Sequence, residues 1–144
     1  MNLKDFKEFL SLGIVKKQTI NRERALSIIK EVGNKKQFLE ISIKTISEEN
    51  MNHNFIVEQC YDIIMELIRA KMFLDGYNAG NSHEAEVSYL KILGFSESEV
   101  RFMDEIRYYR NGTKYYGTIL DKNYADKVLE FMNKLYPKLK SINK

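Results

Sequence analysis

The chain contains few of the residues that interrupt helices or cross-link small proteins. Its 144 residues include one proline, seven glycines, one cysteine and no tryptophan. A single thiol, Cys60, excludes both an intrachain disulfide and a zinc site built from several cysteines, as is usual in a reducing compartment. The scarcity of proline and glycine removes most of the turn signals that separate short β-strands, and therefore favours long helices.

Charge of one sign is not in large excess either. The chain carries 23 Lys and Arg against 20 Asp and Glu, a formal net charge of +3. Such a mixed surface argues against a protein that coats DNA, so any contact with nucleic acid should be local. Residues 1–12 alternate charge and apolarity and lack the apolar stretch of a signal peptide or membrane span. We therefore expect a soluble, cytoplasmic protein with no membrane partner.

Apolar residues recur at helical spacing along most of the chain. A chain of this length can close one sizeable core, so residues 1–144 should form a single all-α domain, an antiparallel helical bundle of about five to six helices. The expected elements are one or two helices over 21–46 with a weak point at Gly33-Asn34, a central apolar helix over 55–74, a short helix behind an Asn81/Glu84 capping box, a helix behind a Ser96/Glu99 capping box, and a last helix from Asp121 to Leu139.

The most distinctive segment spans residues 107–117, with the sequence RYYRNGTKYYG. It combines cations that can neutralise phosphate, rings that can stack on bases, and an amide that can bond to base edges, so phosphate or nucleic acid is the first ligand class to consider. On a helix, Arg107, Arg110 and Lys114 line one stripe, because they are three and four positions apart. Asn111 and Tyr115 fall on the neighbouring face.

Arg107 and Arg110 differ in whether an acidic residue of the same helix can pair with them. Asp104 can pair with Arg107, whereas no acidic residue stands three or four positions from Arg110. Arg110 is therefore the best single candidate for binding a ligand. The tyrosines cannot all face one way, so some belong to the core or to an interface.

A β-hairpin is the alternative for this segment, because Asn111-Gly112 between aromatic flanks is also a type I′ turn signal. A lone hairpin is marginal without a sheet to join, and no other segment is a clear strand. We therefore prefer the helix. Gly112 would then cost about 1 kcal/mol relative to alanine, which suggests close approach by another backbone or room for a ligand.

The run Arg110-Asn111-Gly112-Thr113-Lys114-Tyr115 resembles the Arg-Asn-x-x-x-His signature of the HEPN superfamily, with Tyr115 in place of the histidine. The preceding apolar helix, the next helix start at Ser82-His83-Glu84 and the final helix extend this resemblance over about three-quarters of the chain. It implies a helical bundle of the HEPN type and a homodimer with the motif in a shared cleft. Many HEPN proteins are metal-independent endoribonucleases, toxins or defence effectors, and others accompany a minimal nucleotidyltransferase or bind nucleotides.

The resemblance leads us to expect a protein that binds RNA or nucleotide phosphate, in a toxin-antitoxin or defence-like pair with a minimal nucleotidyltransferase. The expected binding residues are Arg107, Arg110, Asn111, Lys114, Tyr115 and Tyr116. One alternative is a metal-independent endoribonuclease with Arg110 and Tyr115 as catalytic residues, and another is a non-catalytic dimerisation bundle. A buried Arg110 paired within one subunit would favour the last.

Tyr115 bears directly on the enzymatic alternative. RNA cleavage without a metal begins with attack of a 2′-hydroxyl on the adjacent phosphate, for which an arginine can stabilise charge and an imidazole can move protons. Tyrosine, with an ordinary pKa near about 10, is a poor base at neutral pH but can orient a phosphate. No cofactor or metal is expected, because Val87 stands where a zinc-protease motif beginning at His83-Glu84 would need its second histidine.

Overall fold

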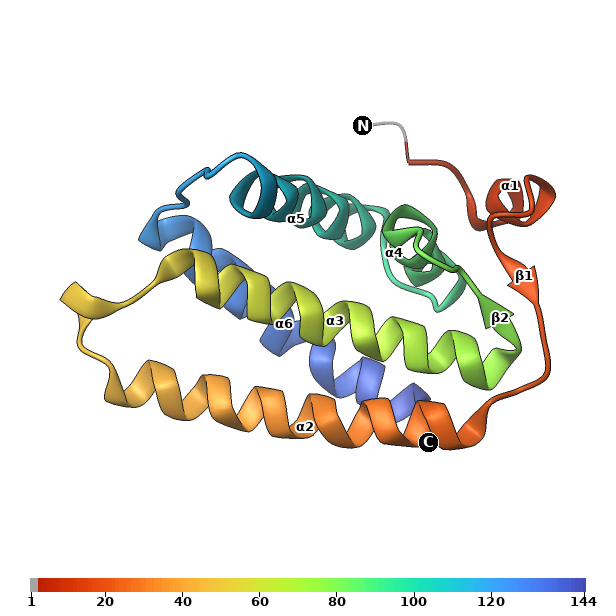
Figure 1. Cartoon of the computed structure of the whole chain (residues 1–144), viewed down its shortest axis with the longest axis horizontal. Helices are drawn as coiled ribbons and strands as arrows, with labels where there is room; N and C mark the ends of the chain where they lie inside the picture. The colour runs from red at the N-terminus through yellow and green to blue at the C-terminus, as the bar shows by residue number, and fades with distance from the viewer. Residues whose placement is uncertain (1–2) are drawn as a thin grey trace.

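Six α-helices joined by short connections form the framework of residues 3–144, the part of the chain that the computed structural model describes (Figure 1). The predicted all-α helical bundle is therefore confirmed. In chain order the elements are α1 (Phe6–Ser11), β1 (Lys16–Lys17), α2 (Arg22–Thr45), a 3₁₀ turn η1 (Glu48–Asn50), α3 (His53–Asp75), β2 (Tyr77–Asn78), α4 (His83–Ile92), α5 (Glu97–Tyr115) and α6 (Lys122–Ile142).

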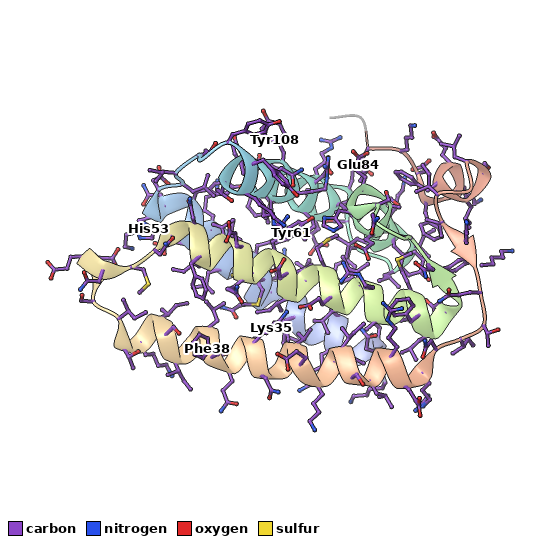
Figure 2. The ribbon with its side chains drawn as sticks, viewed as in Figure 1. Lys35, Phe38, His53, Tyr61, Glu84 and Tyr108 are labelled. Carbon is purple, nitrogen blue, oxygen red and sulfur yellow. The ribbon has the colours of Figure 1, made fainter. Side chains whose placement is uncertain are left out.

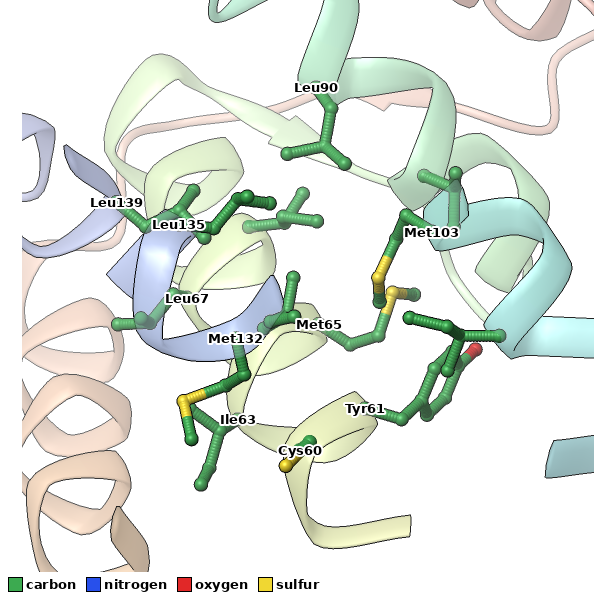
Figure 3. Packing of buried hydrophobic residues seen from close by; sticks show 14 of the residues in the cluster. Cys60, Tyr61, Ile63, Met65, Leu67, Leu90, Met103, Met132, Leu135 and Leu139 are labelled. Carbon is green, nitrogen blue, oxygen red and sulfur yellow. The ribbon is translucent and has the colours of Figure 1, made fainter. Parts of the chain in front are cut away.

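Helix α3 lies at the centre of the bundle, as its apolar sequence predicted. It contacts α2, α4, α5 and α6, with α2 running alongside it on one side and α4 and α5 lying on the other (Figure 1). Its inward residues interlock with side chains of the surrounding helices in one core cluster (Figure 3). Fully buried members of that cluster include Ile64, Leu67, Leu90, Met103, Met132 and Leu135.

Most helix ends follow the capping residues of the sequence. The predicted Ser96/Glu99 capping box is present, and the Asp121 side chain accepts a hydrogen bond from the third residue of α6. Gly76 ends α3 in the left-handed conformation, with φ of 83°. The expected Asn81/Glu84 box is wrong by one residue: Ser82 is the N-cap of α4, and its hydroxyl accepts from the Ala85 backbone.

The tyrosine-rich segment is helical, which confirms the preference over a hairpin. Helix α5 continues through Asn111-Gly112 to Tyr115, and the chain then folds back so that the Thr118 backbone N–H donates to the Gly112 carbonyl at 3.2 Å. A Cβ on Gly112 would lie 3.0 Å from the Thr118 hydroxyl oxygen. At the Cβ position of Gly112 the close neighbour is therefore the Thr118 side chain, rather than the backbone or the ligand that we expected.

The structure also gives details of the helices and strands that the sequence did not predict. Residues 21–46 form one helix rather than two, since α2 runs unbroken through Gly33. Helix α1 and the two-residue strands, in which Lys16 opposes Asn78 and Lys17 opposes Tyr77, were not predicted. Within residues 3–144, no helix combines the length and apolarity needed to cross a membrane.

Candidate functional site

Arg110 extends from α5 toward α3 rather than into solvent. Its side chain is only 13% exposed, and one guanidinium nitrogen lies 3.9 Å from a carboxylate oxygen of Asp62. The guanidinium also sits over the ring of Tyr61, 5.4 Å from the ring centroid. Its Nε is buried without any hydrogen-bond partner in the described chain. The Asp62 contact is too long to be a hydrogen bond, so the guanidinium is enclosed but incompletely satisfied.

Arg107 is held by carboxylates, as predicted from its spacing to Asp104. Its Nε donates to Asp104 at 2.8 Å, and a terminal nitrogen lies 3.7 Å from a Glu84 oxygen at the start of α4. Asp104 itself is buried, so this ion pair also neutralises a charge inside the bundle. Arg107 is consequently less available for an external anion than Arg110.

The α3 and α4 side chains around Arg110 are the part of the site that the sequence analysis missed. The Tyr61 hydroxyl lies 3.3 Å from Nδ1 of His83, and the two residues come from different helices, α3 and α4. Burial raises the pKa of the Asp62 carboxyl, with Arg110 acting in the opposite direction. Burial lowers the pKa of His83. The shift of Asp62 moves its titration toward neutral pH, whereas the shift of His83 moves its titration away from neutral pH, to lower values.

A second acidic residue of α3 approaches the last turns of α5. The Thr113 hydroxyl lies 3.0 Å from a Glu58 carboxylate oxygen and 2.8 Å from the Arg110 carbonyl oxygen. Glu58 is thus tied to Thr113, and the carboxylate that lies beside the Arg110 guanidinium is that of Asp62, with which an external anion must compete. No cluster of three or more His, Cys, Asp or Glu suited to a metal ion occurs within residues 3–144.

The other predicted binding residues lie on a different part of α5. Asn111, Tyr115 and Tyr116 line a pocket of about 550 Å³ together with Tyr108, Tyr109, Gly112 and Thr118. Tyr115 is 65% exposed and Tyr116 is 84% exposed. The exposed Lys114 places its ammonium 5.5 Å from the centroid of the Tyr115 ring.

The candidate residues therefore form two groups within one chain. Arg107 and Arg110 face α3 and α4, and we call them, with Tyr61, Asp62 and His83, the Arg110 cluster. The tyrosines and Asn111 form the tyrosine pocket, which Arg110 does not line. Tyr115, expected to act with Arg110, is not among the side chains that contact it in the same subunit. Arg110 meets in part the condition for a purely structural role, because it is mostly buried beside Asp62.

Comparison of the chain with family models, curated proteins and solved structures found no significant match.

Proposed function

We propose that this protein binds the phosphate of RNA or of a nucleotide through Arg110. The observation that supports this proposal most strongly is the Arg110 guanidinium: within the described residues its Nε has no hydrogen-bond partner, and the carboxylate beside it, that of Asp62, lies at 3.9 Å. A buried donor without an acceptor is destabilising, and a phosphate oxygen is the acceptor that a guanidinium matches best. The exposed Lys114 adds positive charge one turn further along α5.

Asp62 fits this proposal as an internal stand-in for the ligand. Burial raises its pKa despite the nearby arginine, so its ionised form is less stable there than in an exposed aspartate. A phosphate that reaches Arg110 would replace a poorly placed carboxylate with a closer anion. The gain comes from hydrogen bonds that Asp62 cannot make at its present distance.

The resemblance to HEPN proteins supplies the biological setting that we propose. In it the chain forms a homodimer in which Arg110, Asn111 and Tyr115 of both copies line a shared cleft, and a minimal nucleotidyltransferase is its toxin-antitoxin or defence partner. In the proposed dimer Tyr115 of the partner subunit would approach Arg110, which the Tyr115 of the same subunit does not contact. Sedimentation would test the dimer, and co-purification with a nucleotidyltransferase encoded beside this chain would test the pair.

The test of phosphate binding is retention of labelled single-stranded RNA in EDTA at low salt. We expect Arg110→Ala to lose most of the retention by the wild type. The matched control is Arg101→Ala, which removes the same charge from the same helix at an exposed position near Glu97. Equal loss in both variants would mean general attraction between charges, and full retention by Arg110→Ala would reject the proposal.

A metal-independent endoribonuclease is the second candidate, and the Arg110 cluster is the observation that favours it. The 2′-hydroxyl attacks phosphorus, its proton passes to a base, and the bond to the 5′-oxygen breaks as an acid protonates that oxygen. Arg110 would stabilise the charged intermediate, and His83 or Asp62 is better suited to move protons than the exposed Tyr115. Cleavage in EDTA that disappears in Arg110→Ala and changes its pH profile in His83→Gln would establish this reaction.

A further inference from the structure

The tyrosine pocket has the size and lining of a site for a small planar molecule. Its volume of about 550 Å³ lies within the range of small-molecule sites in proteins. Four of its seven lining residues are tyrosines: Tyr108, Tyr109, Tyr115 and Tyr116. Tyrosine offers a flat apolar face at low conformational cost and a polar tip, so such a pocket suits an aromatic ring with polar edges.

The walls of the pocket are fixed by contacts outside it. Tyr109 packs edge-on against Tyr124 of α6 at 5.1 Å between ring centroids, and the Tyr124 hydroxyl donates to Glu105 at 3.0 Å. This chain of contacts holds one wall of the pocket against the bundle. A preformed wall lowers the entropic cost of binding.

The loop that closes the pocket is held in a similar way. The Asn54 side chain at the start of α3 donates to the Thr118 carbonyl at 2.8 Å and accepts from the Leu120 backbone N–H at 2.8 Å. Thr118 also bonds through its backbone to Gly112, where the absence of a side chain leaves room for the Thr118 hydroxyl. The loop is thus positioned before any ligand arrives.

The polar groups of the pocket indicate which ring would fit. The Asn111 amide lines the pocket and makes no hydrogen bond with any residue of 3–144, so its donor and its acceptor are both available. An asparagine amide pairs with the adenine edge that presents the 6-amino donor beside the N7 acceptor. Nothing charged lines the pocket, which suits a neutral ring rather than a phosphate.

We propose that the tyrosine pocket binds the purine base of a nucleotide, with the rings of Tyr115 and Tyr116 as stacking surfaces and the Asn111 amide reading the adenine edge. Lys114, whose ammonium lies 5.5 Å from the centroid of the Tyr115 ring, stands beside the pocket and would meet the phosphate of the same molecule. The inference rests on the proposed function for the ligand being a nucleotide. It adds a base site, distinct from the phosphate site, with its own specificity.

The test uses adenosine, which carries no phosphate. Adenosine should shift the amide resonances of the pocket residues, and Tyr115→Ala should weaken its affinity about tenfold, the effect of losing one base–aromatic stack. Tyr115→Phe, which keeps the ring, should restore the affinity lost in Tyr115→Ala. The control is Phe38→Ala, which removes an equally exposed ring from α2 on the opposite side of the molecule from Tyr108 (Figure 2). Inosine, which replaces the amino donor with an acceptor, should bind more weakly than adenosine.

The outcomes separate this inference from the proposed function. Adenosine binding that survives Arg110→Ala, with RNA retention also unchanged, would uphold the base site and reject the phosphate site. Absence of adenosine shifts in the pocket, or equal affinity in wild type and Tyr115→Ala, would overturn the inference. So would a dimer that dissociates in Tyr115→Ala and is unaffected by adenosine, because the pocket would then be covered by a second copy of the chain.

Discussion

Replacing Asp62 by asparagine removes the anion that competes for Arg110 while keeping the size of the side chain. Two unit charges about 4 Å apart interact by about 4 kcal/mol at an effective dielectric constant near 20. Asp62 is 37% exposed, however, and solvent screening reduces such pairs toward about 1 kcal/mol. We therefore expect Asp62→Asn to bind single-stranded RNA about fivefold more tightly than the wild type.

The pH dependence of binding tests the same pair. Because burial raises the pKa of Asp62, its carboxyl takes up a proton as the pH falls from neutral, before an ordinary aspartate would. RNA retention by the wild type should therefore strengthen on mild acidification, and Asp62→Asn should lack that part of the increase.

The raised pKa of Asp62 should also make the stability of the fold fall as the pH rises. A pKa that is raised by folding means that the folded state binds the proton more tightly than the unfolded state. Asp62 then contributes stability that is present below its unfolded pKa and lost as the pH rises through its folded pKa. Urea unfolding of Asp62→Asn should be less dependent on pH in this window.

The control for Asp62→Asn is Asp126→Asn, which removes the same charge from an exposed pair with Lys122 on α6. If both variants bound RNA more tightly by the same factor, the effect would come from the change in net charge and not from the loss of the carboxylate beside Arg110. Weaker binding by Asp62→Asn would refute the reasoning, because Asp62 would then support the ligand or the position of Arg110 rather than compete.

Three further predictions concern the fold. Glu86 is only 2% exposed and accepts two hydrogen bonds from Arg69, so Glu86→Ala should lower the free energy of unfolding in urea by about 3 kcal/mol. This value is at the low end for buried ion pairs, because the Arg69 side chain is 32% exposed. Gly112→Ala should leave the thermal unfolding temperature nearly unchanged, because the gain of about 1 kcal/mol from the helix preference of alanine is offset by the close contact of its Cβ with Thr118. In a Thr118→Ala background, which removes the Thr118 hydroxyl, Gly112→Ala should instead stabilise the protein. Cys60, buried and with its pKa raised to about 12, should react with iodoacetamide at pH 8 only after unfolding, and rapid labelling of the native protein would contradict its core position.

The local features of the fold could be predicted because local chemistry determines them. The Ser96/Glu99 capping box, the cap at Asp121 and the central apolar helix each depend on residues a few positions apart. The segment around Asn111-Gly112 is helical despite its hairpin signal, because α5 packs against α3 and α4 and, in the part of the chain that the structure describes, no sheet packs against α5.

The cross-helix part of the site could not be predicted from spacing. Asp62 stands 48 positions before Arg110 and meets it only because α3 and α5 pack together. Tyr61 is buried on α3, and no local spacing indicated that its hydroxyl would reach His83 on α4. Such contacts depend on the tertiary arrangement, which a single sequence does not specify through periodicity alone.

The central claim is that Arg110 holds a phosphate, and the most direct measurement is the ¹H–¹⁵N resonance of its Nε during titration with a short single-stranded RNA. This Nε–H is buried and has no acceptor among residues 3–144, so a bound phosphate should shift it strongly and saturably. The resonance is assigned by its loss in Arg110→Lys, and the exposed Arg101 provides the internal reference. A saturable shift at Arg110 that exceeds the shift at Arg101 is the predicted result. RNA binding that leaves the Arg110 resonance unmoved would contradict the proposal.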